Sequence, residues 1–180
     1  MQEKELVESA VACGVHKAEI ISNEKIITSP VFRDICASNA CGLYGKCWMC
    51  PPDIGEINRL IGVVRQYAFG LWYQTVWHIE DSFDFEGMLA AKKEHSRISR
   101  EIEAALMPLL GEKYLHLSSG GCGYCQTCSK AEGYSCRFPE NARSSLEAYG
   151  IDVYNTTKNT ALKYINGQDT VTYFGVILFG

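Results

Sequence analysis

Eight of the nine cysteines in this 180-residue chain fall into two compact groups of four. The later group consists of Cys122, Cys125, Cys128 and Cys136. Its spacing is C-x2-C-x2-C and then a fourth cysteine with Pro139 close behind, near the C-x2-C-x2-C-x3-C-P run of bacterial ferredoxins. A chain curling round a cuboidal cluster can supply one thiolate every third residue, and the neighbouring glycines let the backbone approach it. The later group therefore predicts a [4Fe–4S] cluster.

Zinc is the main alternative at the later group. Structural zinc commonly takes one C-x2-C pair and a second pair from a distant segment, whereas three successive cysteines at this spacing crowd one tetrahedral ion. Seven residues separate Cys128 from Cys136, which is enough for a loop to return Cys136 to the same cluster. In two-cluster ferredoxins the fourth cysteine ligates the other cluster, so an exchange between the groups stays open.

The earlier group packs four thiols into fifteen residues and is followed by Pro51 and Pro52. Its members are Cys36, Cys41, Cys47 and Cys50. The order matches no ferredoxin run, but four closely spaced thiols in a glycine-containing loop again favour a [4Fe–4S] cluster, with structural zinc as the alternative. Cys36 is the least certain ligand because it lies furthest from the C-x2-C pair.

Composition narrows the class of protein. An apolar fraction of 47% and a charged fraction of 21% are typical of a globular protein, and we expect a single domain over residues 1–180. A net charge of −4 argues against nucleic-acid binding, and no apolar stretch is long enough for a membrane span. The first residues lack the apolar core of a signal peptide, so we expect a cytoplasmic protein whose thiols bind metal and form no disulfides.

The elements that must position the cysteines follow from apolar periodicity and from the turn residues. The expected helices are 3–13, one capped by Asp53 with Glu56 as its partner, 85–107, and 139–149. The expected strands are a hairpin over 18–28, a strand buried on both faces over 68–79, and strands at 113–118 and 171–179. Alternating strands and helices predict an α+β (or α/β) fold: a single sheet of about four or five strands, helices packed on it, and cysteine-rich loops at 36–52 and 120–139. The helices starting at Asp53 and Glu140 would direct backbone N–H groups at anionic clusters.

Residues outside the two groups carry weaker signals. Cys13 lies on the apolar side of the first helix and is expected to be a small buried hydrophobe. His95 lies on the apolar stripe of the long helix, where a core position is expected. His116 is interpreted as a hydrogen-bonded sheet residue, with an approach to a cluster as the alternative. Arg137 and Arg143 either have surface or capping roles or contact an anionic cluster.

Two runs, CGLYGKCWMCPPD and GGCGYCQTCSKAEGYSCRFPENARSSLEAYGIDV, resemble a bacterial and archaeal family of predicted metal-binding proteins, a domain of unknown function. The resemblance covers most of the chain, and all eight grouped cysteines stand where that family's ligands are expected. It implies metal binding and indicates no substrate.

Three functional hypotheses follow. The first is electron transfer: two clusters pass single electrons to a redox partner protein, and eight cysteines leave no iron open. The second is an enzyme in which one cluster, with Cys36 as its labile or absent ligand, binds substrate at an open iron. The third is a zinc-stapled binding module with no redox role. Neither the choice between enzyme and carrier nor the oligomeric state follows from the sequence.

Overall fold

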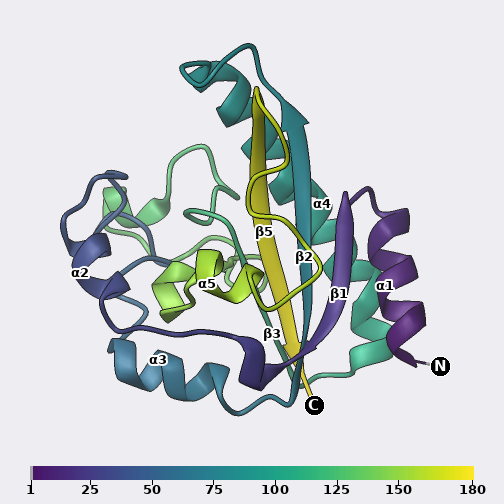
Figure 1. Ribbon diagram of the computed structural model, residues 1–180. Helices are drawn as coiled ribbons and strands as arrows, with labels where there is room; N and C mark the ends of the chain where they lie inside the picture. Colours follow the sequence, from purple (N-terminus) through teal and green to yellow (C-terminus); the bar gives the residue numbers. More distant parts are fainter. Residues whose placement is uncertain (1) are drawn as a thin grey trace.

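The computed structural model describes residues 2–180 and contains one five-stranded sheet with the strand order β1-β2-β5-β3-β4 (Figure 1). The strands are β1 (Lys17–Ser22), β2 (Phe69–His78), β3 (Tyr114–Ser118), β4 (Ser144–Ser145) and β5 (Thr170–Phe179). All neighbours are antiparallel except β3 and β4, which are parallel. The predicted α+β class and the predicted single sheet are confirmed.

Helices cover both faces of the sheet. One face carries α1 (Gln2–Ala12) and α4 (Phe85–Leu110), and the other carries α2 (Phe32–Ala37), α3 (Ile57–Val64) and α5 (Val153–Thr157) (Figure 1). Short 3-10 turns follow β1 (η1, Asn23–Lys25), the later cysteine triplet (η2, Ser129–Glu132) and β4 (η3, Glu147–Tyr149). No helix within residues 2–180 is long and apolar enough to cross a membrane.

The two long central strands are buried on both faces, as their apolar composition predicted. In β2, Leu71 and Tyr73 face α1 and α4, whereas Trp72 faces the opposite core. In the neighbouring β5, Ile177 and Val176 divide between the two cores in the same way. This alternation follows from the two-residue period of a strand, and it gives the sheet a core on each side.

The long helix α4 was predicted within a few residues. The Asp84 side chain caps it by accepting the N–H of Gly87 at 2.8 Å, and Gly111, with φ 72°, ends it. Pro108 lies inside the last turn. His95 is fully buried on the apolar stripe, so its predicted core position is confirmed.

Three local predictions were wrong because long-range contacts outweighed local signals. Asp53 caps no helix: α3 begins at Ile57 with Glu56 at its N-cap, and no side chain bonds there. The predicted helix 139–149 is instead turns, the short strand β4 and η3, because β4 pairs with β3. The predicted hairpin 18–28 is absent, since β1 pairs with β2 and leads into η1. No helix starts at Asp53 or at Glu140, so the predicted backbone N–H groups of these two helix ends are not available to clusters.

Candidate metal centre

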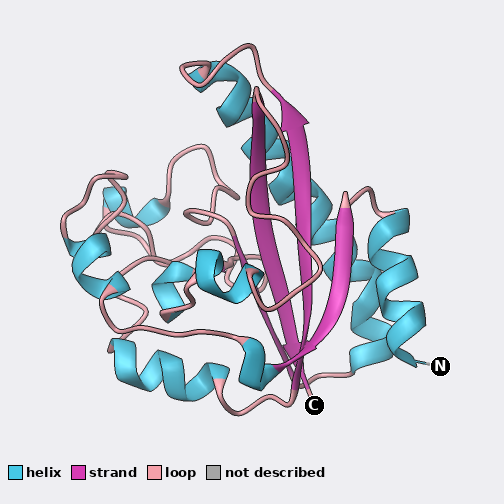
Figure 2. Cartoon of the chain, viewed as in Figure 1, coloured by secondary structure: helices cyan, strands magenta, loops and turns pink. Residues whose placement is uncertain are grey.

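The two cysteine-rich loops pack against each other beside the sheet, where Figure 2 shows them mainly as irregular chain. The Trp48 indole N–H donates to the Tyr134 carbonyl at 2.9 Å. The Lys130 ammonium lies 2.5 Å from the Asp53 carboxylate and 4.2 Å from the centre of the Trp48 ring. Segments far apart in the sequence thus form one cysteine-rich region.

A glycine is required where the loops meet. A Cβ placed on Gly121 would lie 2.2 Å from the Leu43 side chain and 3.8 Å from the Cys50 sulfur. A larger residue at position 121 would therefore displace the earlier loop from the later one. This close approach explains why the later cysteine run is preceded by glycine.

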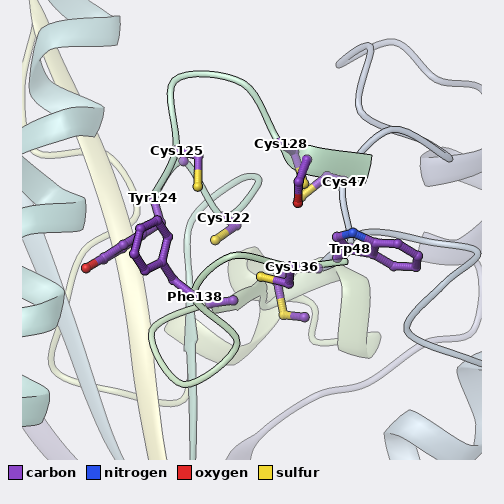
Figure 3. A pocket seen from close by; sticks show the side chains of 12 residues that line it. Cys47, Trp48, Cys122, Tyr124, Cys125, Cys128, Cys136 and Phe138 are labelled. Carbon is purple, nitrogen blue, oxygen red and sulfur yellow. The ribbon is translucent and has the colours of Figure 1, made fainter. Parts of the chain in front are cut away.

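Five cysteines line one pocket between the loops (Figure 3). They are the complete later group and one member of the earlier group: Cys122, Cys125, Cys128, Cys136 and Cys47. The pocket has an empty volume of about 370 Å³, part of it open to solvent. Tyr124 and Phe138 form one side and Trp48 the other, so aromatic rings border the thiols (Figure 3).

Cys47 is the junction between the two groups. Its pKa is lowered to about 6, chiefly by a hydrogen bond from Cys50, and burial opposes this change. The backbone N–H groups of Met49 and Cys122 and the Cys128 side chain also donate to its sulfur. An exchange between the groups was left open by the sequence, but nothing in it singled out Cys47 as the cysteine in contact with the later group.

The other cysteines of the earlier group gather round Cys50. The pKa of the Cys50 thiol is raised, first by its hydrogen bond with Cys47, then by burial and by the negative charges of Cys47, Cys41 and Cys36. Cys36 lies in α2, a helix that the sequence analysis missed, and the negative charge of Cys41 helps to raise its pKa as well, after burial. All four predicted ligands of the earlier group therefore lie within electrostatic reach of one another.

Cys122 in the later group resembles Cys50 in that burial and neighbouring cysteine charges raise its pKa. Burial raises its pKa most, and the charges of Cys47 and Cys136 add to the effect. The backbone N–H groups of Tyr124 and Arg143 point at its sulfur and act in the opposite direction. Donors of this kind stabilise a thiolate, the form that binds metal.

The donor set is that of a thiolate-bound metal centre. Within residues 2–180, no three His, Cys, Asp or Glu side chains converge closely enough to hold a single metal ion. Five thiols nevertheless line one pocket, and thiolate sulfur is the ligand of both structural zinc and iron–sulfur clusters.

Family comparison supports metal binding by the whole chain. A family model described as "Predicted metal-binding protein (DUF2284)" matches residues 19–179. The chain belongs to this family. The matched range includes both cysteine-rich loops and all five strands except the first two residues of β1. No curated protein and no solved structure matches the chain.

In this DUF2284 protein Arg137 and Arg143 have the structural roles that were one of the two interpretations, and a different arginine lies near the cysteines. Arg137 pairs with Glu132 at 2.6 Å, and Arg143 pairs with Glu103, so neither is free for a cluster. The Arg100 guanidinium lies 5.5 Å from the centre of the Tyr124 ring. Arg100 is on the exposed side of the predicted helix 85–107, where charged residues are usual, and so carried no signal in the sequence.

A buried polar network lies beside the cysteine pocket and was also missed. The Glu103 carboxylate accepts Tyr114 Oη–H at 2.9 Å and Arg143 Nε–H at 2.8 Å, and it lies 3.1 Å from His116 Nδ1. Burial alone would raise the pKa of Glu103, but bonds from His116 and Arg143 lower it to about 2. Burial lowers the pKa of His116, more than Glu103 raises it. His116 is thus a hydrogen-bonded sheet histidine, as interpreted from the sequence.

The network continues from His116 through hydroxyl groups. His116 Nε2 lies 2.7 Å from Tyr73 Oη, which is 2.8 Å from Ser99 Oγ, and Ser99 is 3.1 Å from Ser118 Oγ. An ionised Glu103 can only accept, so His116 carries a proton on Nδ1. The Tyr73 hydroxyl donates to Ser99 Oγ, which also accepts from Ser118. One ionised carboxylate therefore anchors a chain of side chains that reaches Ser118.

The chain ends at a second buried histidine. Ser118 Oγ is 3.1 Å from His95 Nε2, and His95 Nδ1 is 2.9 Å from Thr75 Oγ1. Burial, assisted by the nearby His116, lowers the pKa of His95 to about 3. Since Ser118 already donates to Ser99, His95 donates from Nε2 and accepts the Thr75 proton at Nδ1.

Proposed function

We propose that this protein binds two [4Fe–4S] clusters and transfers single electrons to a redox partner protein in the cytoplasm. One cluster is held by Cys36, Cys41, Cys47 and Cys50, and the other by Cys122, Cys125, Cys128 and Cys136. The observation that carries the proposal is the pocket into which four later-group thiols and Cys47 converge. When bound, such clusters supply reversible one-electron chemistry.

Hydrogen bonds to sulfur support iron–sulfur clusters over zinc. Backbone N–H groups donate to Cys47 and Cys122, and donors to ligand sulfur raise the reduction potential of a cluster. Trp48, Tyr124 and Phe138 border the same pocket and would limit the access of water, a second means of tuning the potential. A structural zinc ion has no redox couple that these features could adjust.

The contact between the loops supports electron transfer between the groups. Cys47 belongs to the earlier group by sequence, yet it accepts hydrogen bonds from Cys122 and Cys128 of the later group. Electrons entering one cluster would thus have a short path through Cys47 to the other. Within residues 2–180 all nine cysteines are free, which agrees with a reducing compartment.

Metal analysis of anaerobically purified protein tests the proposal. We expect brown protein with about eight irons per chain and a visible absorption band that dithionite bleaches. Cys125→Ser should remove about half of the iron, and Cys41→Ser the other half. Cys13→Ser is the matched control and should retain all iron, because Cys13 is a partly buried residue that packs against the core on the α1 and α4 side of the sheet, outside both cysteine groups. Colourless protein with stoichiometric zinc would reject the proposal.

A second candidate function is an enzyme, because a polar pocket adjoins Cys122. An open iron would be expected to bind a small ligand such as azide, and this would change the visible and electron paramagnetic resonance spectra. Cys36→Ser would separate the candidates at the earlier group. Unchanged iron content with altered azide binding would favour an enzyme, whereas loss of that cluster would mean that Cys36 is an ordinary ligand.

A further inference from the structure

A second cavity lies next to Cys122, and polar residues make up most of its lining. Its empty volume is about 340 Å³, part of it open to solvent, and it is lined by five serines, two arginines, an asparagine, a histidine, two glycines and Cys122. No aliphatic or aromatic side chain takes part. Ordinary ligand pockets are mainly apolar with a few polar groups, so this composition indicates a small, strongly polar ligand.

The charges at the cavity favour an anion. Arg143 is balanced by the Glu103 carboxylate, which it contacts through two nitrogens. Arg100 also lines the cavity, and within residues 2–180 its guanidinium contacts only the Tyr124 ring and no carboxylate. Arg100 therefore brings to the cavity a positive charge that no carboxylate balances. A guanidinium with free donors is suited to a carboxylate or an oxyanion.

We propose that this cavity binds a small carboxylate or oxyanion, held by the Arg100 guanidinium next to His116, directly beside the proposed later-group metal centre. The inference goes beyond the proposed function. Binding of the anion depends on Arg100 and not on the identity of the metal, and His116 is the group that takes up a proton when the anion binds.

Anion binding is coupled to a proton through His116. The ring faces the Glu103 carboxylate and Arg100 from α4, Arg143 from the segment before β4, the Tyr73 hydroxyl from β2, and Tyr114 from its own strand β3. Glu103 favours the imidazolium ion, whereas burial and Arg143 oppose it. A second negative charge in the cavity adds to the effect of Glu103, so Nε2 takes up one proton from bulk water.

The hydroxyl groups accommodate the protonated ring. His116 Nε2 then donates to Tyr73, whose hydroxyl donates to Ser99. Ser99 and Ser118 line the cavity together with His116, so their hydroxyl groups also face the ligand. The carboxylate of Glu103 lines a wider surface depression with Tyr114 and Glu140, which gives the proton a route from solvent. No other group needs to change its charge.

Calorimetric titration of the anaerobic holoprotein with sodium formate and with sodium nitrite tests the proposal. We expect saturable binding, weakened about tenfold or more by Arg100→Gln because charge-assisted hydrogen bonds are lost. Arg97→Gln is the matched control. It lies one turn earlier on α4 and is paired with Glu94 and Glu101, so affinity should not change.

Proton uptake on anion binding distinguishes the proposed role of His116 from a purely structural role, which would not change the number of protons taken up. Titrations of wild type in phosphate and in Tris, which differ in ionisation enthalpy, should show about one proton taken up per anion near neutral pH. His116→Gln should abolish the uptake. If that variant does not fold, the pH dependence of anion binding by the wild type tests the same point. The wild-type affinity for formate or nitrite should fall as the pH rises.

Several results would overturn the inference. They are the absence of saturable formate and nitrite binding, equal binding by Arg100→Gln and wild type, and anion binding without proton uptake. Absence of binding would also mean that Arg100 serves to neutralise the metal centre. Iron content, measured on the same samples, decides the proposed function separately, so that either idea can fail alone.

Discussion

Replacement of Glu103 by glutamine should destabilise the protein strongly although it removes no carbon. The carboxylate accepts hydrogen bonds from Tyr114, His116 and Arg143, and its side chain is only 10% exposed. Glutamine cannot neutralise Arg143, and its NH2 group would face one of the present donors. The variant thus leaves a partly buried cation without its counter-charge, which is among the costlier defects in a protein interior.

The magnitude follows from the pKa of Glu103. The pKa falls from its ordinary 4.5 to about 2 in the folded protein. A difference of that size corresponds to about 3 kcal/mol of stability at neutral pH. Because the folded pKa is the lower one, the contribution is complete above about pH 5 and is lost as the pH falls through 4.5 towards 2. The difference in unfolding free energy between wild type and Glu103→Gln should therefore become smaller in acid.

Thermal unfolding of the anaerobic protein at a fixed scan rate measures this effect. For a chain of this length, about 3 kcal/mol corresponds to a decrease in Tm of roughly 6–12 °C. Glu101→Gln is the control on the same helix, because Glu101 forms a half-exposed pair with Arg97 worth about 1 kcal/mol or less. If both variants unfold within about 2 °C of each other at pH 7, the reasoning is wrong.

Two further predictions concern packing and loop contact. Gly175→Ala should lower the stability by about 1–3 kcal/mol, measured by thermal unfolding, because the new methyl group would lie 2.2 Å from the Tyr73 ring and hydroxyl; Gly62→Ala, which meets nothing within 4 Å, should not. Lys130→Met removes the cation between the cysteine loops and leaves the largely buried Asp53 carboxylate without its partner, so it should lower the Tm and speed the release of metal to a chelator several-fold. Lys158→Met, which also removes a cation over an aromatic ring, should leave that rate unchanged, and equal release rates for both variants would contradict the second prediction.

The regular elements could be predicted where periodicity and end signals agree. The helix over 85–110 has an apolar stripe, an aspartate cap and a glycine stop, and β2 and β5 are apolar on both faces. The helix prediction after Pro139 was wrong because the structure of that segment depends on the pairing of β4 with β3. Local sequence carries no information on this contact. The α2 helix was missed because only six residues form it, too few for a periodic pattern.

The cysteine groups were visible in the sequence because ligand spacing is local. The position of Cys47 between the two groups was not visible, since it depends on the packing of Leu43 against Gly121, two residues far apart in the sequence. The polar network has the same origin. Glu103, His116 and Tyr73 come from three elements that become neighbours only when the sheet and α4 assemble. Contacts of long sequence separation are the part that a single sequence does not supply.

Neither apolar core contains a residue from 27–56 or 118–145. The two apolar cores of the sheet thus form without side chains from the cysteine loops. For the proposed clusters this makes folding and loading separable: the chain would form its sheet first and receive iron and sulfide afterwards. A damaged centre would then be rebuilt in place, without unfolding or replacement of the polypeptide.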